Sequence, residues 1–196
     1  MFYNERKAGD FLRKNGFHIL DRIFVRREKD LERAFSKIGF PAVMKISGKK
    51  IVHKKKIGGV ILGIKNYGDG LLAFKKLKKI KGFEEAIIQP VVMGDEFILG
   101  IKKAPEFGHI ILFGNGGSNV EKNKDVSFRV YPLAKKDAKE MIEETKISKK
   151  ISRSEKKFLV KSILKLNSLI KRHSSIKELD INPMKGNFVV DSRAVF

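Results

Sequence analysis

A single histidine in the first third of the chain stands within a run of lysines. His53 lies in KISGKKIVHKKKIGGV, a stretch that begins at Lys45 and ends with a Gly-Gly pair and a valine. An imidazole can act as a nucleophile and carry a phosphoryl group, and positive charges fixed around it, such as Lys54, stabilise the phosphate. Because lysine is frequent throughout the chain, an ordinary solvated loop explains the same stretch. The local residues leave both interpretations open.

A glycine-rich segment, FGNGG at residues 113–117, follows an apolar run. Its glycines, Gly114, Gly116 and Gly117, would let backbone N–H groups approach phosphate oxygens, as in an anion cradle. The segment has neither the dinucleotide-binding nor the Walker pattern, and a tight turn explains the glycines more simply. Three charged residues spaced four apart follow it and could organise magnesium and phosphate: Glu121, Asp125 and Arg129.

Two aspartates and an asparagine stand near the end of the chain, in ELDINPMKGNFVVDSR. A short turn between two apolar strands would bring Asp180, Asn182 and Asp191 into one neighbourhood. Carboxylate and amide oxygens of this kind suit Mg²⁺, which takes its remaining ligands from water and nucleotide phosphates. An Asn-Pro turn flanked by solvated acids is the competing explanation.

Further polar residues interrupt apolar strands. Lys45 ends the run PAVMK and either reaches the surface or points into a site. In IIQPVVMGDE, extended backbone at Gln89, Val91 and Val92 could bind an adenine edge, and Glu96 is placed for ribose hydroxyls. An ordinary hairpin explains this stretch equally well.

Composition excludes several other chemistries. The chain has no cysteine and four scattered histidines, so disulfides, cysteine nucleophiles and a zinc site are not expected. No nucleophile-elbow motif supports a Ser–His–Asp triad. Lys and Arg number 43 against 22 Asp and Glu, giving a net charge of +21 that attracts polyanions of any kind. No stacking platform accompanies this charge, so nucleic-acid binding is a secondary hypothesis.

Length and periodicity indicate one domain or two small lobes within 196 residues. No apolar run approaches the ~18 residues of a membrane helix, and the charged start is unlike a signal peptide, so a cytoplasmic protein is expected. Helices are predicted at residues 4–16, 28–39, 66–82, 134–145 and 155–172. Strands are predicted at 17–25, 41–46, 58–64, 86–92, 96–103, 109–113, 176–182 and 188–196. This mostly alternating order favours α+β lobes.

Taken together, these motifs resemble the ATP-grasp domain of the nucleoside-diphosphate-forming acyl-CoA synthetases, and most closely the β subunit of the archaeal ADP-forming acetyl-CoA synthetases. The matching stretches are GFPAVMK with IVHKKKIGGV, then FGNGGSNVEKNKDVSFR, then IKELDINP with VDSR. The resemblance extends from about residue 5 to the end. It implies an α+β ATP-grasp fold with nucleotide between two lobes, expected at residues 1–92, with the His53 loop, and 93–196, with the magnesium and phosphate site.

The resemblance also implies an activity: acyl-CoA, ADP and phosphate are converted to acid, CoA and ATP by way of phosphohistidine. It assigns the phosphoryl-carrying histidine to His53, assisted by Lys54, and phosphate contacts to Lys45. It assigns adenine and ribose to the Gln89–Val92 stretch and Glu96. The phosphate region would contain Glu121, Arg129 and the three glycines, and Mg²⁺ would be held by Asp180, Asn182 and Asp191. Cofactors are therefore ATP or ADP with Mg²⁺.

A separate CoA-binding α subunit, itself carrying a phosphohistidine, is the implied partner, and a hetero-oligomer is expected. The chain departs from the family pattern beside the histidine, with SGKK before it and three lysines after it, and the Gly-Arg-Gly loop before the last helix is not evident. These departures favour one alternative, a non-catalytic nucleotide-binding protein of the same fold. Two further alternatives are a basic nucleic-acid binder and a carboxylate–amine ligase. The acyl acid and the choice of ADP or GDP are left open.

Overall fold

The computed structural model describes residues 1–48, 51, 54–117 and 124–196, which form two compact units. The smaller unit is Leu20–Val92, and the larger unit joins Met1–Ile19 to Met93–Phe196. The sequence-based division had placed residues 1–92 in one lobe, whereas here residues 1–19 pack with 93–196. The reason is that the first helix lays its apolar face, with Ala8 and Leu12, in the core of the larger unit.

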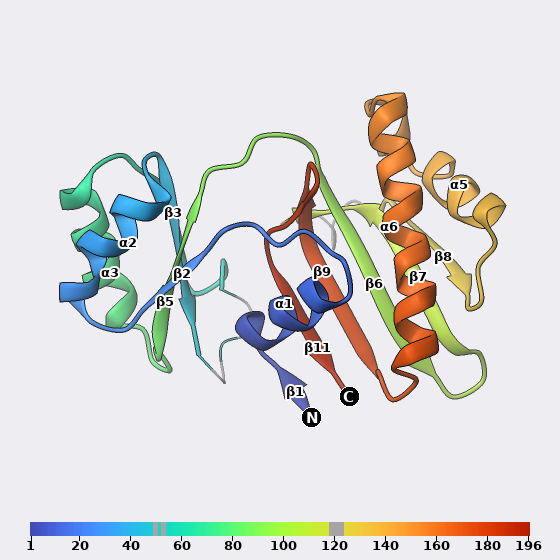
Figure 1. Cartoon of the computed structure of the whole chain (residues 1–196), viewed down its shortest axis with the longest axis horizontal. Helices are drawn as coiled ribbons and strands as arrows, with labels where there is room; N and C mark the ends of the chain where they lie inside the picture. The colour runs from blue at the N-terminus through green and yellow to red at the C-terminus, as the bar shows by residue number, and fades with distance from the viewer. Residues whose placement is uncertain (49–50, 52–53, 118–123) are drawn as a thin grey trace. The chain divides into compact units, whose positions relative to one another are not determined.

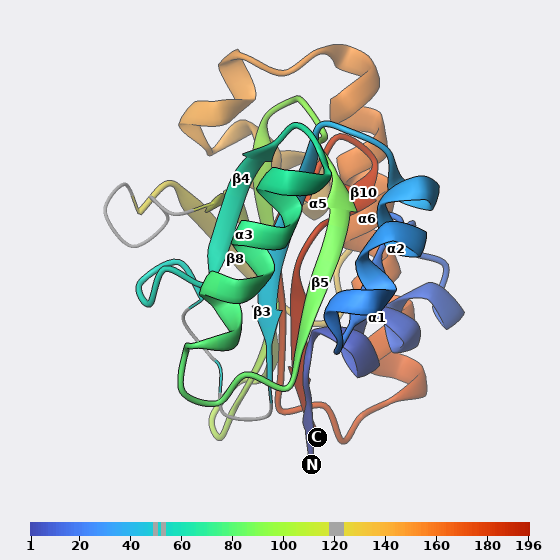
Figure 2. The same cartoon turned by 90° about the vertical axis from the view of Figure 1, so that its left-hand side faces the viewer.

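The smaller unit is a four-stranded antiparallel sheet with two helices on one face (Figure 2). Its strand order is β2-β5-β3-β4, with β2 at Ile23–Val25, β3 at Ala42–Ser47, β4 at Val60–Ile64 and β5 at Glu85–Pro90. The helices are α2, Leu31–Ile38, and α3, Tyr67–Lys78, and a 3-10 turn, η1, spans Glu28–Asp30. Asn66 begins α3 by accepting the Asp69 N–H at 2.9 Å. Alternate strand residues such as Met44 and Ile88 fill the core beneath the helices.

The larger unit is built on a seven-stranded antiparallel sheet of order β1-β11-β9-β6-β7-β8, with β10 beside β9. The strands are β1 Phe2–Tyr3, β6 Glu96–Ala104, β7 Gly108–Asn115, β8 Val126–Val130, β9 Glu178–Lys185, β10 Phe188–Val189 and β11 Ser192–Val195. The helices are α1 Glu5–Lys14, α5 Lys135–Glu143 and α6 Arg153–Arg172, with a 3-10 turn, η3, at Lys146–Lys149. Both α1 and α6 lie across the same face of the sheet (Figure 1). The α+β architecture predicted from the sequence is confirmed.

Local signals account for where the helices of the larger unit begin. Asn4 caps α1 as predicted, because its Oδ1 accepts the Lys7 N–H at 3.2 Å. Ser152 and Glu155 form a capping box: each side chain accepts the other's backbone N–H, at 3.2 and 2.9 Å. Helix α6 therefore starts at Arg153, two residues before its predicted start. Nowhere in the described ranges is a helix both long enough and apolar enough to cross a membrane.

The strand register divides the residues of the larger sheet between a helix-covered face and the opposite face, called here the open face because none of the described helices of this unit lies on it. Leu179 and Ile181 of β9 are buried in the core with α1 and α6. Asp180 and Asn182 alternate with them and therefore point to the opposite face. Asp180 is paired across the ladder with Gly100 of β6. The open face of β9 is thus where the predicted metal ligands lie.

Candidate functional site

Three strands of the larger unit place a row of charged side chains on the open face. Asp180 of β9 is paired with Arg193 of β11, whose Nε donates to the Asp180 Oδ2 at 3.2 Å. The same guanidinium contacts Glu178 at 3.1 Å, and Glu178 also accepts from Lys102 of β6 at 2.8 Å. Cross-strand neighbours of opposite charge stabilise this ladder. Arg193, which the sequence interpretation had not singled out, is the cation closest to the predicted metal ligands in this row.

The surroundings of Asp180 disfavour the ionised form of its carboxyl group. Burial raises the pKa of its carboxyl group above the ordinary value for aspartate, and the neighbouring carboxylates of Asp191 and Glu178 raise it further. The Arg193 guanidinium lowers the pKa but only partly compensates. The folded protein therefore disfavours the ionised form of Asp180, mainly because the carboxyl group is buried. A cation bound to the carboxylate would favour the ionised form.

Asp191 lies beside Asn182 because the final stretch of the chain bends. Residues 188–196 were predicted as one strand, but Val190 and Asp191 separate β10 from β11. The Val190 N–H donates to the Pro183 carbonyl at 3.0 Å, and the Asn182 N–H donates to the Asp191 carbonyl at 3.1 Å. The bend thus holds Asp191 against the middle of β9, next to Asn182.

The glycine turn, defined here as residues 115–117 at the end of β7, folds onto the open-face end of β6 and β9. The Gly116 N–H donates to the Glu96 carbonyl at 2.6 Å. The Gly117 N–H donates to the Asn182 Oδ1 at 2.7 Å. Asn182 therefore already accepts one hydrogen bond from the turn, while a carbonyl-type oxygen has a second lone pair for another donor or a cation. Asn182 joins the turn to the predicted metal site.

Close packing against backbone explains why the three predicted phosphate-region residues are glycines. A Cβ at Gly114 would lie 2.3 Å from the Asp125 carbonyl, and one at Gly116 would lie 2.4 Å from the Phe97 backbone. Gly117 has a φ of +82°, and a Cβ there would lie 1.8 Å from the Glu96 Oε2. Only glycine fits these positions without displacing a neighbour. Close packing and the positive φ of Gly117 are a sufficient reason for the glycine pattern, so its role at phosphate stays a prediction.

Glu96, predicted for ribose, lies at the start of β6 beside the glycine turn. Its Cα partner across the ladder is Lys185 of β9, and the Lys185 Nζ lies 3.2 Å from the Glu96 Oε1. The other carboxylate oxygen, Oε2, faces Gly117. Both side chains of the pair are partly buried, with 33% of the glutamate and 23% of the lysine exposed. Lys185 is a second site residue that sequence reasoning missed.

The donor set on the open face fits Mg²⁺. Among the residues that the structure describes, no three His, Cys, Asp or Glu side chains converge as a metal cluster. Magnesium does not need such a cluster, because it is usually held by one or two carboxylates together with substrate phosphates and water. Asp180 and Asp191, with the amide oxygen of Asn182, supply that number of ligands. The structural observation that supports the fit is the grouping of these residues: the Asn182 N–H donates to the Asp191 carbonyl at 3.1 Å, and Asp180 lies close enough to Asp191 for the two carboxylates to interact.

The polar residues in and just before β8 face away from this site. Asp125, Ser127 and Arg129 alternate with outward residues, and the pairings Phe113–Ser127 and Ile111–Arg129 place them on the helix-covered face. The Asp125 carboxylate accepts the Lys146 N–H at 2.7 Å and the Ile147 N–H at 3.1 Å at the start of η3. Spacing by four in a strand keeps residues on one face, and here that face is covered by α5 and η3.

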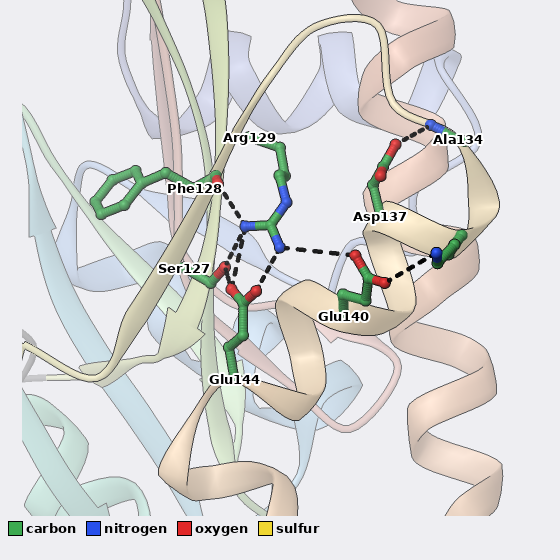
Figure 3. A network of polar contacts seen from close by, with 8 residues as sticks. Ser127, Phe128, Arg129, Ala134, Asp137, Glu140 and Glu144 are labelled. Atoms are coloured by element: carbon green, nitrogen blue, oxygen red, sulfur yellow. Dashed lines mark hydrogen bonds and ion pairs between the residues drawn. The ribbon is translucent and has the colours of Figure 1, made fainter.

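Arg129 is engaged by acidic side chains at the end of α5 (Figure 3). Its guanidinium donates to both carboxylate oxygens of Glu144, and the Ser127 Oγ donates to Glu144 at 2.5 Å. The hydrogen bonds from Arg129 and then Ser127 lower the pKa of Glu144 below its ordinary value. Phe128 points to the other side of the strand. The predicted role of Arg129 at phosphate stays a prediction, and its observed contacts are structural.

The smaller unit presents two of the predicted nucleotide residues on one sheet face. Met44, Ile46 and Ile88 face the helices, so Lys45 and Gln89, which alternate with them, lie on the opposite face. Lys45 is 5% exposed and Gln89 1% exposed. The adenine prediction used the backbone of the following residues, and the Val91 N–H already donates to the Pro41 carbonyl at 3.3 Å. Val92, the last residue of this unit, follows β5 outside any strand.

The Gly-Gly pair after the basic run fixes the base of the predicted histidine loop. Gly58 has a φ of +67°, and a Cβ at Gly59 would lie 2.4 Å from Ile46 and 2.9 Å from the Lys54 carbonyl. The Gly59 N–H donates to the Lys54 carbonyl at 2.7 Å, and the Gly59 carbonyl accepts from Ile46 at 2.8 Å. Lys54 is thereby held close to β3. His53 and Glu121 lie outside the described residues, so their assignments stay predictions.

Comparison with known proteins identifies the family. The sequence model of the ATP-grasp domain matches residues 2–194. An acetate–CoA ligase (ADP-forming) II from Archaeoglobus fulgidus is 38% identical over the whole chain, which covers 30% of that protein. The β subunit of acetate–CoA ligase (ADP-forming) I from Pyrococcus furiosus is 34% identical over 92% of the chain and 84% of its own length. The chain belongs to the ATP-grasp family of ADP-forming acid–CoA ligases.

Further similar proteins are named for a different acid or have been solved with bound ligands. A 4-hydroxybutyrate–CoA ligase (ADP-forming) from Nitrosopumilus maritimus is 34% identical over 96% of the chain, which covers 30% of it. The solved acetyl-coenzyme A synthetase 1 of Ca. Korarchaeum cryptofilum, in complex with coenzyme A and Ca-AMPCP, has a TM-score of 0.89 at 29% identity, covering 100% of this chain and 93% of that one. In a second structure of the Korarchaeum enzyme, with coenzyme A and Mg-AMPPCP, the phosphohistidine segment points towards the nucleotide-binding site. That structure has a TM-score of 0.82 at 28% identity, covering 100% of this chain and 92% of that one.

Proposed function

We propose that this chain is the nucleotide-binding, β-type part of an ADP-forming acyl-CoA synthetase and transfers a phosphoryl group between a histidine and ADP or ATP. The observation that carries the proposal is the set formed by Asp180, Asn182 and the adjoining glycine turn in a chain of this family. The chain spans about 30% of the length of the first of its relatives and most of the length of separate β subunits. The partner would be a CoA-binding α part that carries its own phosphohistidine.

In the proposed reaction His53 is the covalent intermediate carrier. In the direction of ATP consumption, an imidazole nitrogen of His53 attacks the γ-phosphorus of ATP, a nitrogen–phosphorus bond forms, and the bond to the bridging oxygen breaks as ADP leaves. The imidazole proton is released to solvent. Lys54 would stabilise the added phosphate charge. Support comes from the family membership and from the phosphohistidine segment named for the Korarchaeum structure.

The remaining predicted residues would bind and orient the nucleotide. Lys45 would meet its phosphates, the segment at Gln89–Val92 would accept the adenine, and Glu96 would hold ribose hydroxyls. Asp180, Asn182 and Asp191 would hold Mg²⁺, which when bound neutralises phosphate charge. The Mg-AMPPCP bound in the related structure supports this cofactor assignment. Relatives named for acetate and for 4-hydroxybutyrate leave the acyl acid open.

The experiment that tests the proposal is labelling with γ-phosphate-labelled ATP and Mg²⁺. The wild-type chain, His53→Ala and the matched control His18→Ala, an exposed histidine of the larger unit, are compared. We expect an acid-labile, alkali-stable label on the wild type and the control but not on His53→Ala. Nucleotide binding without any label, in the presence of the α part, would indicate the non-catalytic alternative, and salt-sensitive binding to nucleic acid without nucleotide binding would indicate the basic binder.

A further inference from the structure

Two lysine–glutamate pairs close the two ends of the ladder between β6 and β9. At one end Lys102 is the Cα partner of Glu178 and lies 2.8 Å from it. At the other end Lys185 is the Cα partner of Glu96 and lies 3.2 Å from it. The two pairs share strands, face and chemistry. They differ in what the carboxylate touches next, because only Glu96 lies against the glycine turn.

Lys185 determines how the Glu96 carboxylate is oriented. The Lys185 ammonium lies beside the Glu96 Oε1, and the Glu96 Oε2 lies so close to Gly117 that a Cβ at residue 117 would clash with it. The main chain of Glu96 is fixed as well, since its carbonyl accepts the Gly116 N–H at 2.6 Å. A glutamate side chain normally has several rotamers available, so the ammonium at Oε1 and the close approach of Gly117 to Oε2 restrict the choice among them. The carboxylate is therefore pre-oriented before any ligand arrives.

Lys185 also sets the charge at this position. Without the lysine, Glu96 would present a full negative charge beside a turn where a nucleotide carries several negative charges of its own. Like charges at short distance in a partly buried site repel more strongly than they would in water. The ammonium cancels that charge while leaving the carboxylate oxygens able to accept further hydrogen bonds.

We propose that Lys185 is a positioning residue for nucleotide binding, holding Glu96 in the orientation in which it accepts ribose hydroxyls. The inference rests on the proposed function, in which Glu96 binds ribose. Lys185 does not touch the reacting atoms and acts only through Glu96. Its effect should therefore depend on whether the ligand has hydroxyls to offer.

The test compares ADP with 2′,3′-dideoxy-ADP by isothermal titration calorimetry at fixed Mg²⁺. Wild type should prefer ADP by about tenfold, the size expected of one charge-assisted hydrogen bond. Lys185→Met should weaken ADP more than 2′,3′-dideoxy-ADP and so bring that preference close to one, and Glu96→Gln should likewise bring the preference close to one. Lys185→Arg should restore most of the preference. The matched control Lys102→Met, which removes the other pair of the same ladder, should leave the preference unchanged.

Three results would overturn the inference. Equal weakening of both ligands by Lys185→Met would mean that the lysine contacts phosphate directly or supports the fold. An unchanged preference would mean that Glu96 does not need its partner. A wild type that binds both ligands equally would mean that Glu96 does not bind the ribose hydroxyls. A wild type that binds neither ligand would instead refute the proposed function, and this inference with it, so the two failures are distinguishable.

Discussion

Replacing Asp125 tests whether the acidic residue after the glycine-rich region is structural. Asp125 is 8% exposed, and its carboxylate accepts two backbone N–H groups at the start of η3, those of Lys146 and Ile147. In Asp125→Ala both donors lose their acceptor. The Ile147 N–H is buried, so it pays the full cost of an unsatisfied donor, about 2 kcal/mol, while the Lys146 N–H, partly buried, loses about 1 kcal/mol. We expect the free energy of unfolding to fall by about 3 kcal/mol.

The assay is equilibrium urea unfolding followed by far-UV circular dichroism, because the chain has no tryptophan. Asp125→Asn keeps one acceptor and should lose about 2 kcal/mol. The control is Asp137→Ala, which removes an exposed carboxylate accepting the Ala134 N–H at 2.7 Å and should lose no more than about 1 kcal/mol because water replaces it. If Asp125→Ala lost no more than this control, the carboxylate would not be the anchor between β8 and η3.

Three further substitutions test other contacts. Arg129→Ala should lower the free energy of unfolding by about 1 kcal/mol near neutral pH. Because the pKa of Glu144 is lowered in the folded protein, the ion pair stabilises the fold above the ordinary pKa of glutamate, and this stabilisation is lost as Glu144 is protonated. The difference between wild type and Arg129→Ala in urea titrations should therefore shrink as the pH falls. Gly117→Ala should lower the free energy of unfolding by at least about 1 kcal/mol more than Gly16→Ala does, since both glycines have a φ of +82° but only Gly117 lies against a carboxylate. Equal losses would show that a Cβ at Gly117 does not clash with Glu96. Asp180→Asn should raise the unfolding free energy at neutral pH, because the folded state disfavours the charged form, yet weaken Mg²⁺-dependent nucleotide binding by about tenfold or more in calorimetry.

The local signals in the sequence predicted much of the larger sheet's open face. Alternation in ELDIN is enough to place Asp180 and Asn182 on the face opposite Leu179 and Ile181, because a strand has a period of two. The Asn4 cap is likewise a local signal, since it needs only its own side chain and an N–H three residues later. Features decided within a few residues of chain were therefore accessible.

Features decided by long-range pairing were not. The spacing of Asp125 and Arg129 placed them on one face, but which face α5 and η3 cover depends on the tertiary fold, so the contacts of these residues with α5 and η3 could not be predicted. The pair of Lys185 with Glu96 depends on a register that shifts between Phe97 and Leu99, and no local pattern encodes such a bulge. The placement of residues 1–19 with the larger unit likewise depends on α1 packing against β11, far along the chain.

The pairing of β1 with β11 bears on how this fold is reused in longer proteins. Phe2 is the Cα partner of Val195, so the polypeptide enters and leaves the larger sheet at neighbouring points on one edge. A domain whose two ends are neighbours can be joined to a longer polypeptide at either end without disturbing the pairing of its terminal strands. The matching region is 30% of one relative and 84% of another, and ends that lie side by side are compatible with both lengths of polypeptide.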